Sequence, residues 1–382
     1  MRRTGLIVLI GILLAATALV TISSTTDGPV RWTPDGLFYQ ARALELRGQD
    51  QATALERTFQ GPLGSNLRLT DPEHSGDPSW VTYNAPFYER RVAVPAAAAA
   101  LEPIAGDRAI LDLSIAGYVA AILAIFALLL LRFSLPIATA VTLATSFLPA
   151  LTRHSAFPLT DSWGLALETA AFTFAILAIR RGTRWVVPWA AAILVLSFTR
   201  DSMWIPILAA GWLAVTLRSR VSWWLAGTGV AAVLPVLLLF SLPTRELLAT
   251  MLNGAQPVAD PSWSFVAQHY PGAIVDLLRA DGGAVRNGEF LTALFFLGGL
   301  LLLFALARRS HEGPVATLLK AGSMAGVAYV LAVPIFSAFR LELVLVPMAA
   351  FGLGLGAERL LAYATAMSRA HTPTLVPRRS QT

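Results

Sequence analysis

Three short stretches of the sequence each place an arginine near an acidic residue: Arg153 with Asp161, Arg200 with Asp201, and Arg340 with Glu342. A guanidinium group binds a phosphate group through two parallel hydrogen bonds. A neighbouring carboxylate neutralises such an arginine or serves as a general base. If the three stretches meet in space, they indicate a site for an anionic ligand such as a phosphate-bearing lipid head group.

Acidic residues at two further positions fit this chemistry. Asp35 follows Thr33 and Pro34, which are typical of a helix start because threonine caps the first turn and proline fits there. An acid in a first turn is stabilised by the positive end of the helix, and this structural role is the alternative to catalysis. Facing a basic cavity, Asp35 would act as a general base. Asp161 and Glu168 are seven residues apart, which predicts a polar stripe on one helix face.

The composition places these charges in a membrane protein. Of the 382 residues, 55% are hydrophobic and only 14% are charged, against about 25% charged residues in a soluble domain. This balance excludes an ordinary soluble enzyme. The chain has no cysteine, which excludes disulfides, thiolate metal sites and thiol catalysis.

Apolar segments long enough for a bilayer core of about 30 Å, or nearly so, predict an all-α, polytopic bundle of about ten transmembrane helices. They cover residues 5–22, 109–131, 134–152, 162–179, 185–198, 203–217, 221–242, 290–307, 316–337 and 341–361. The fifth and sixth segments are short, and a single interrupted helix is the alternative.

Dense arginine clusters orient this bundle. With the N-terminus inside, the positive-inside rule is satisfied at every short cytoplasmic loop; the residues are Arg132, Arg180, Arg181, Arg184, Arg218, Arg220, Arg308, Arg309, Arg378 and Arg379. Fusing the fifth and sixth segments would put Arg218 and Arg180 on opposite sides, so we expect ten spans. The net charge of +6 then reflects topology, and no nucleic-acid partner is expected.

The domain organisation follows from this topology. We expect one integral membrane domain, residues 1–367, and a disordered cytoplasmic tail, 368–382. Two long loops, about 23–108 and 243–289, lie outside. In the first loop, the segments from 34 and from 86 predict juxtamembrane amphipathic helices on the outer membrane surface.

The three arginine–acid stretches fall in short outer turns on this topology, where the positive-inside rule disfavours arginine. Ionisable groups at a membrane boundary mark a functional site by default. The alternative is that each arginine reaches lipid head groups and is neutralised by its nearest acid.

The layout resembles the GT-C superfamily of polytopic glycosyltransferases, especially bacterial members related to protein mannosyltransferases and lipid A aminoarabinose transferases. The shared features are a first span, a large outer loop opening with DGLFYQARALEL, an amphipathic stretch YNAPFYERRVAVP, and a bundle of further spans. The segments FPLTDSWGLALETAAF and FSAFRLELVLVPMAAFGLG stand where such enzymes place an acid and an arginine near the lipid phosphate.

This resemblance implies transfer of a hexosyl or pentosyl group from a polyprenyl-phosphate-linked sugar to a glycan, lipid or protein acceptor on the extracytoplasmic face. Asp35 would be the catalytic base or orient the acceptor, and Arg340 and Arg200 would hold the donor phosphate. The remaining candidate substrate-binding residues are Asp161, Arg153, Glu168 and Tyr39.

Many family members carry paired acids at the first-loop motif, whereas Gly36 follows Asp35 here. The five histidines are scattered without ligand spacing. We therefore expect neither a metal site nor a cofactor.

Two other classes of protein remain open. One is a lipid-linked sugar flippase or transporter, which tends to show internal repeats and charges near the bilayer midplane. The other is a non-catalytic subunit of an envelope-polymer assembly, which would share the fold without a working site. The arginine- and alanine-rich composition, with Lys320 the sole lysine, is typical of a GC-rich bacterial genome. We expect a multi-pass protein of a bacterial plasma membrane with both termini cytoplasmic.

Overall fold

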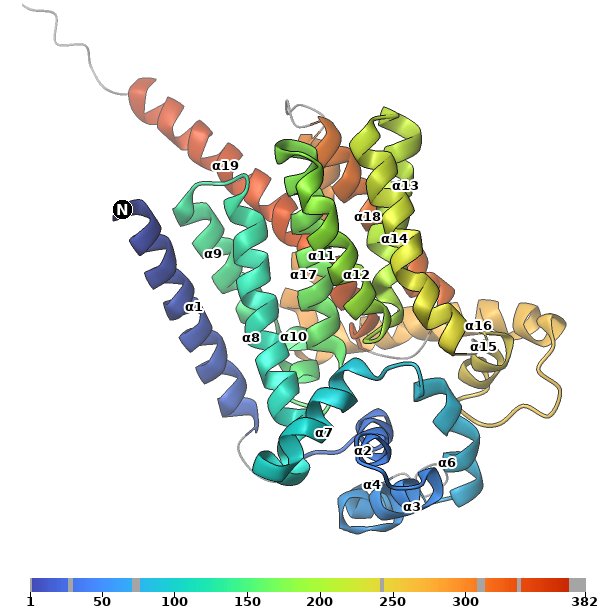
Figure 1. Ribbon diagram of the computed structural model, residues 1–382. Coiled ribbons are helices and arrows are strands. Elements are labelled where there is room, and N and C mark those ends of the chain that lie inside the picture. Colours follow the sequence, from blue (N-terminus) through green and yellow to red (C-terminus); the bar gives the residue numbers. More distant parts are fainter. Residues whose placement is uncertain are drawn as a thin grey trace, which may run out of the picture.

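The computed structural model describes residues 2–26, 30–70, 76–240, 244–307, 313–334 and 338–370. Every regular element in these ranges is a helix, which confirms the all-α prediction. A bundle of long helices stands on a cap of short helices (Figure 1). The start of α1 and the end of α19 lie at the end of the bundle opposite the cap.

Seven helical stretches within the described ranges are long and apolar enough to cross a membrane, and a bent pair raises the number to eight. The chain is therefore a multi-pass membrane protein. The helices of these seven stretches are α1 (Arg2–Thr26), α8 (Ala109–Leu130), α11 (Asp161–Arg181), α14 (Arg220–Leu239), α17 (Phe290–Leu306), α18 (Gly313–Ala332) and α19 (Val346–Ala370). The bent pair is α9 (Leu135–Ser146) and α10 (Pro149–Ser155).

The ten predicted segments are all helical along most of their length, but ten crossings are not confirmed. The third segment breaks between α9 and α10 with a bend of 60°. The fifth and sixth correspond to α12 (Val186–Ser197) and α13 (Trp204–Leu217). At 1.5 Å per residue these helices are roughly 20 Å long, which is less than the hydrocarbon thickness of about 30 Å.

The first long loop folds into a cap with its own apolar core. The cap contains α2 (Pro34–Leu46), α3 (Gln51–Leu55), α4 (Ser65–Thr70), α6 (Pro78–Asn84) and α7 (Ala93–Ala105). In its core the Phe38 ring lies 4.7 Å from that of Phe59 and stacks on that of Tyr88 at 4.4 Å. The predicted helix from residue 34 is therefore present as α2. Most of it is buried against the other cap helices and the bundle, so it does not have the exposed face that an amphipathic helix on a membrane surface presents.

The second long loop lies against the cap. It contains α15 (Thr244–Leu252) and α16 (Trp263–Ala284), and α15 and the turn after it contact α6. The Trp80 indole donates to the carbonyl oxygen of Ala255 at 2.7 Å, and the hydroxyls of Tyr83 and Thr250 are 3.0 Å apart. Both long loops are therefore at one end of the bundle, as the predicted topology requires.

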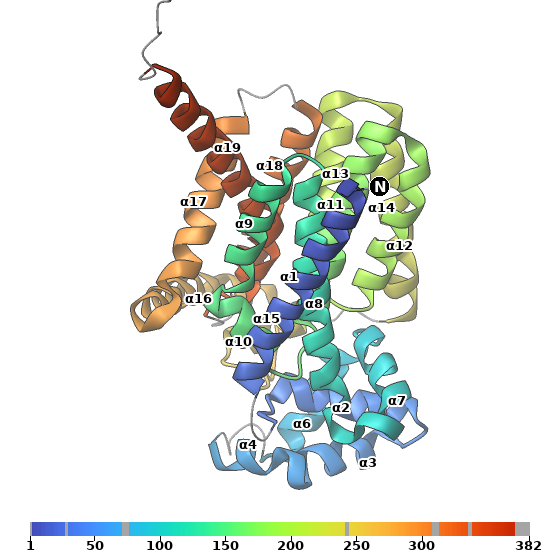
Figure 2. The ribbon, with the colours of Figure 1, turned by 90° about the vertical axis from the view of Figure 1, so that its left-hand side faces the viewer.

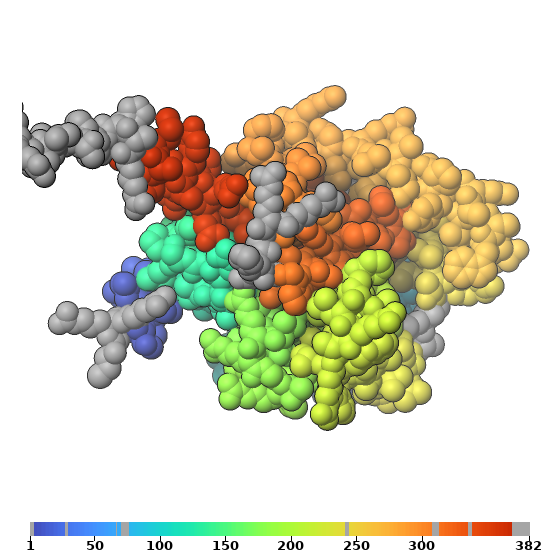
Figure 3. All heavy atoms as spheres, turned by 90° about the horizontal axis from the view of Figure 1, so that it is seen from above, coloured from blue at the N-terminus to red at the C-terminus, as the bar shows by residue number. Residues whose placement is uncertain are grey.

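Glycines let α17 and α19 approach closely. A Cβ atom on Gly352 would lie 1.8 Å from the carbonyl oxygen of Gly299, so the two backbones are in direct contact. Such small-residue contacts are typical of helix packing in membranes. At the middle of α19, Arg132 binds both carboxylate oxygens of Glu358, at 2.9 and 2.8 Å. Beyond that contact α19 runs away from the body (Figure 3). The predicted tail from residue 368 begins as the last turn of α19, and residues 371–382 lie outside the described ranges.

We predict that Gly352→Leu destabilises the bundle by about 2 kcal/mol or more, because the new side chain would overlap the α17 backbone. The matched control is Gly298→Leu, since Gly298 has open space where a Cβ would stand. Apparent Tm values in detergent, followed by tryptophan fluorescence, measure both. Equal Tm values for the two variants would contradict the packing described here.

Candidate functional site

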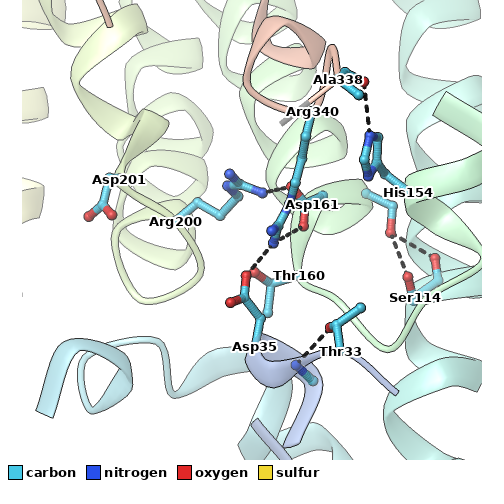
Figure 4. A network of polar contacts seen from close by, with 12 residues as sticks. Thr33, Asp35, Ser114, His154, Thr160, Asp161, Arg200, Asp201, Ala338 and Arg340 are labelled. Carbon is cyan, nitrogen blue, oxygen red and sulfur yellow. Dashed lines mark hydrogen bonds and ion pairs between the residues drawn. The ribbon is translucent and has the colours of Figure 1, made fainter. Parts of the chain in front are cut away.

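Asp35 is held by the first turn of α2. Thr33 caps the helix and accepts a hydrogen bond from the Gly36 backbone N–H at 3.1 Å. A Cβ on Gly36 would stand 2.8 Å from the carbonyl oxygen of Pro158, so only glycine lets α2 lie against the segment before α11. The helix-start prediction is confirmed, and this contact places Asp35 beside Asp161 at the start of α11 (Figure 4).

Arg340 joins the cap to the bundle. Its Nη2 atom lies 2.6 Å from Oδ2 of Asp35 and 3.1 Å from Oδ2 of Asp161, while its Nε lies 3.0 Å from Oδ1 of Asp161. Arg200 also binds Oδ1 of Asp161. Four predicted site residues from four distant segments therefore form one cluster, which Figure 4 shows.

The cluster has a buried side and an accessible side. The side chains of Asp161 and Arg200 are only 2% and 8% exposed, whereas those of Asp35 and Arg340 are 21% and 23% exposed. A ligand approaching from the cap side therefore meets Asp35 and Arg340 first.

A second group of ions lies beside this cluster, and the sequence analysis did not include its two arginines. Arg90 and Arg91 both bind Asp201, with Arg91 Nη2 3.0 Å from Oδ2. Arg91 also donates to the Tyr39 hydroxyl at 2.8 Å, and the Tyr88 hydroxyl donates to Oδ1 of Asp35 at 2.6 Å. The signal was present, because two adjacent arginines in an outer loop also oppose the positive-inside rule.

These neighbours set the protonation of the exposed groups. Burial by itself would raise the pKa of Asp35, but the Arg340 guanidinium and the hydrogen bond from Tyr88 lower it to about 2. Burial and the charge of Asp35 raise the pKa of the Tyr88 phenol well above its usual value. Asp35 is therefore an ionised carboxylate, and Tyr88 is a neutral hydrogen-bond donor beside it.

The arginines do not pair with their nearest acids. Arg200 binds Asp161 and not Asp201, and Arg340 binds Asp161 and Asp35. Glu342 lies within hydrogen-bonding reach of Asp281 instead. The interpretation of local neutralisation is therefore wrong for Arg200 and Arg340, because the chain folds these residues toward carboxylates that are distant in sequence.

Arg153 was expected beside Asp161, but it lies outside the cluster. Its Nη2 atom is 3.0 Å from Oε1 of Glu289 and donates to the carbonyl oxygen of Ala338 at 2.7 Å. Ala338 and Phe339 have φ angles of 44° and 66°, a strained region for residues with a side chain. Arg153 thus helps to hold the turn that presents Arg340.

Two other predicted residues are buried near the cluster. Tyr39 lies beneath it, with its hydroxyl bound by Arg91. Glu168 is buried two helical turns from Asp161, and its carboxylate lies within hydrogen-bonding reach of Ser202. Neither contacts Arg340 through a hydrogen bond or ion pair in the described part of the chain.

The structure offers no assembled metal site in the ranges that it describes, since no three histidine, aspartate or glutamate side chains gather there as ligands. Asp35 and Asp161, the two acids that could have formed a metal-binding pair, are bridged by Arg340. The absence of a metal cofactor stays a prediction.

No protein-family model matches the sequence, and no curated protein is significantly similar to it. Any assignment of function therefore depends on the geometry and charge of the site itself.

Acid should loosen the junction between cap and bundle. Asp35 has a pKa of about 2 in the fold against 3.8 ordinarily, so its pairing stabilises the folded state fully above about pH 4. That contribution, about 2 kcal/mol, is lost as the pH falls toward 2. The apparent Tm in detergent should therefore fall more steeply between pH ~4.5 and ~2.5 for the wild type than for Asp35→Asn. Parallel curves would contradict the pairing.

Proposed function

We propose that the chain is a membrane glycosyltransferase that moves a sugar from a polyprenyl-phosphate donor to an acceptor on the side of the membrane where the long loops lie. The observation that carries this proposal is the meeting of Asp35, Asp161, Arg200 and Arg340 at the junction of cap and bundle. A phosphate attached to a membrane-borne lipid would meet arginines at this depth, and an acceptor would reach Asp35 from the cap side.

The charge balance favours an anionic substrate. The two connected groups contain four guanidinium groups and three carboxylates, which leaves one positive charge; the residues are Arg90, Arg91, Arg200, Arg340, Asp35, Asp161 and Asp201. Of the two arginines that bind Asp161, Arg340 is the more accessible. A guanidinium group binds phosphate through two hydrogen bonds. The donor phosphate would therefore compete with Asp35 for Arg340.

This competition links donor binding to activation of the base. While Arg340 holds Asp35, the pKa of about 2 makes the carboxylate a weak base. When the phosphate takes over Arg340, that stabilisation is lost and burial raises the pKa of Asp35 toward the range of a useful base. The carboxylate would thus become reactive only when donor is bound.

The chemical step then needs one base. Asp35 accepts the proton of an acceptor hydroxyl, whose oxygen forms a bond to the anomeric carbon of the sugar. The bond from that carbon to the phosphate oxygen breaks, and its electron pair leaves with the lipid phosphate, which Arg340 and Arg200 stabilise. The lipid phosphate leaves without a proton, so one carboxylate suffices. Because the sugar is transferred in a single displacement, the anomeric configuration is inverted. Tyr88 orients Asp35 through its short hydrogen bond.

The position of the ions favours an enzyme over a transporter. Asp161 is the first residue of α11, and Arg200 follows the last residue of α12 by three positions. Both lie near the cap, whereas transporters bind substrate near the bilayer midplane. The termini of the described chain lie opposite the cap (Figure 1). We infer a bacterial plasma membrane protein with cytoplasmic termini and an extracytoplasmic cap.

We expect Asp35→Asn to fold and insert normally but to lose transfer by about 100-fold or more, as for removal of a general base. The control is Asp50→Asn, an exposed helix cap in the same loop, where asparagine caps equally well. The assay follows radiolabel from polyprenyl-phosphate sugars into a water-soluble or lipid acceptor fraction. Full transfer by Asp35→Asn would remove the assignment of the base. Label that crosses vesicles while still on its lipid would instead support a flippase.

Arg340→Lys should raise the KM for the donor about tenfold or more, because lysine keeps the charge but cannot bind phosphate bidentately. Arg245→Lys, an exposed arginine of the second long loop paired with Glu246, should leave the KM unchanged. Initial rates at varied donor concentration measure both. A KM equal to wild type for Arg340→Lys would exclude Arg340 from donor binding.

A further inference from the structure

A cavity of about 290 Å³ lies beside the end of α1, apart from the ion cluster. Figure 2 shows this end of α1 next to α10. Its walls come from α1, residues 30–31, α8, α10 and the residue before α17, and the polar lining residues are Thr25, Thr26, Arg31, Thr152, Arg153 and Glu289. None of these residues belongs to the Asp35–Arg340 cluster, so this is a second site.

One wall offers a cation. Arg31 is exposed, and it has no ion-pair or hydrogen-bond partner within the described ranges. The other arginine, Arg153, is already neutralised by Glu289 at 3.0 Å. Counting only lining residues that the structure describes, the cavity has one positive charge that no acid neutralises, which suits a single phosphate diester.

Three threonine hydroxyls of the lining can only accept further hydrogen bonds. Thr25 donates its hydroxyl proton to the carbonyl oxygen of Ile22 at 2.7 Å, and Thr26 donates to the same oxygen at 3.2 Å. Thr152 donates to the carbonyl oxygen of Pro149 at 3.0 Å. Each hydroxyl has one proton and two lone pairs, so a hydroxyl that has already donated its proton can still accept a hydrogen bond. A matching ligand must bring donors of its own, such as hydroxyl groups.

The remaining wall is apolar and leads to the lipid-facing side of α1. Leu111 and Phe157 line the cavity. Only 17% of the apolar window of α1 is buried in the protein, so its side chains face the hydrocarbon of the bilayer. A ligand with an acyl tail can therefore place its head in the cavity and its tail along α1.

We propose that this cavity binds the head group of a phospholipid whose phosphate diester is accompanied by hydroxyl groups, as in phosphatidylglycerol. The phosphate binds Arg31, the hydroxyl groups donate to the threonine oxygens, and the acyl chains lie along α1. The bound head group contacts Arg153, which also holds the Ala338 carbonyl two residues before Arg340. The lipid thus sits behind the turn that presents Arg340 to the first site.

Binding to the full chain, purified in detergent, is measured by native mass spectrometry with phosphatidylglycerol, phosphatidic acid and phosphatidylcholine as probes. We expect phosphatidylglycerol to bind about tenfold more tightly than either of the others, since phosphatidylcholine has no hydroxyl donors and phosphatidic acid has no second head-group alcohol. Equal affinity for the three lipids would overturn the proposal.

Two substitutions separate the contributions. Arg31→Gln should weaken binding of phosphatidylglycerol about tenfold, and its control is Arg57→Gln, which removes an exposed arginine of the cap outside the cavity. Thr152→Val should weaken phosphatidylglycerol but leave phosphatidic acid unchanged. Its control is Thr139→Val, because Thr139 makes the same hydrogen bond to its own helix away from the cavity. Wild-type affinity in both Arg31→Gln and Thr152→Val would refute the assignment.

A third variant tests the cavity as a volume. Ala156→Phe should fill it and abolish phosphatidylglycerol binding without changing any charge. Retained binding by a folded Ala156→Phe protein would place the lipid elsewhere. Competition by soluble glycerophosphoglycerol at the same concentration as the lipid would contradict the role of the apolar wall, whereas weak competition would support it.

Discussion

The guanidinium of Arg340 binds two carboxylates that belong to different layers of the molecule, Asp35 in the cap and Asp161 at the start of α11. A charged group removed from water is costly unless its partners are close and well aligned. Arg340 meets that requirement only when the cap is docked, the turn before it is strained, and α11 begins at Asp161. The other features of the site follow from satisfying this one side chain.

Glycine makes the close approaches on which that arrangement depends. Gly36 lets the first turn of α2 touch the backbone of Pro158, and Gly164 lets the Arg200 side chain cross α11, since a Cβ there would lie 2.6 Å from Cδ of Arg200. Arg153 holds the strained turn at Ala338 from the other side. The ions are thus fixed by packing from several elements, which preorganises their charge for a ligand.

The same arrangement leaves an imbalance that a ligand can use. Asp161 is shared by two arginines, whereas Asp35 has Arg340 as its single ion-pair partner within the described chain. In the proposed function, an incoming phosphate would compete with Asp35, the more exposed of the two carboxylates that Arg340 binds, and would leave the buried Asp161–Arg200 pair in place.

The membrane environment of this protein, its all-helical class and the residue types at its candidate site could all be predicted from the sequence. Scarce charge, apolar segments of helical length and the Thr33–Pro34 helix start all act locally, so they can be read without knowing the fold. The ion pairs of the site could not be predicted from the sequence. Arg200 is adjacent to Asp201 in sequence but binds Asp161, and Arg90 and Arg91 take Asp201 instead. These pairings depend on the packing of distant segments, because an ion in a poorly polarisable interior binds the carboxylate that packing brings closest, whatever its distance along the chain.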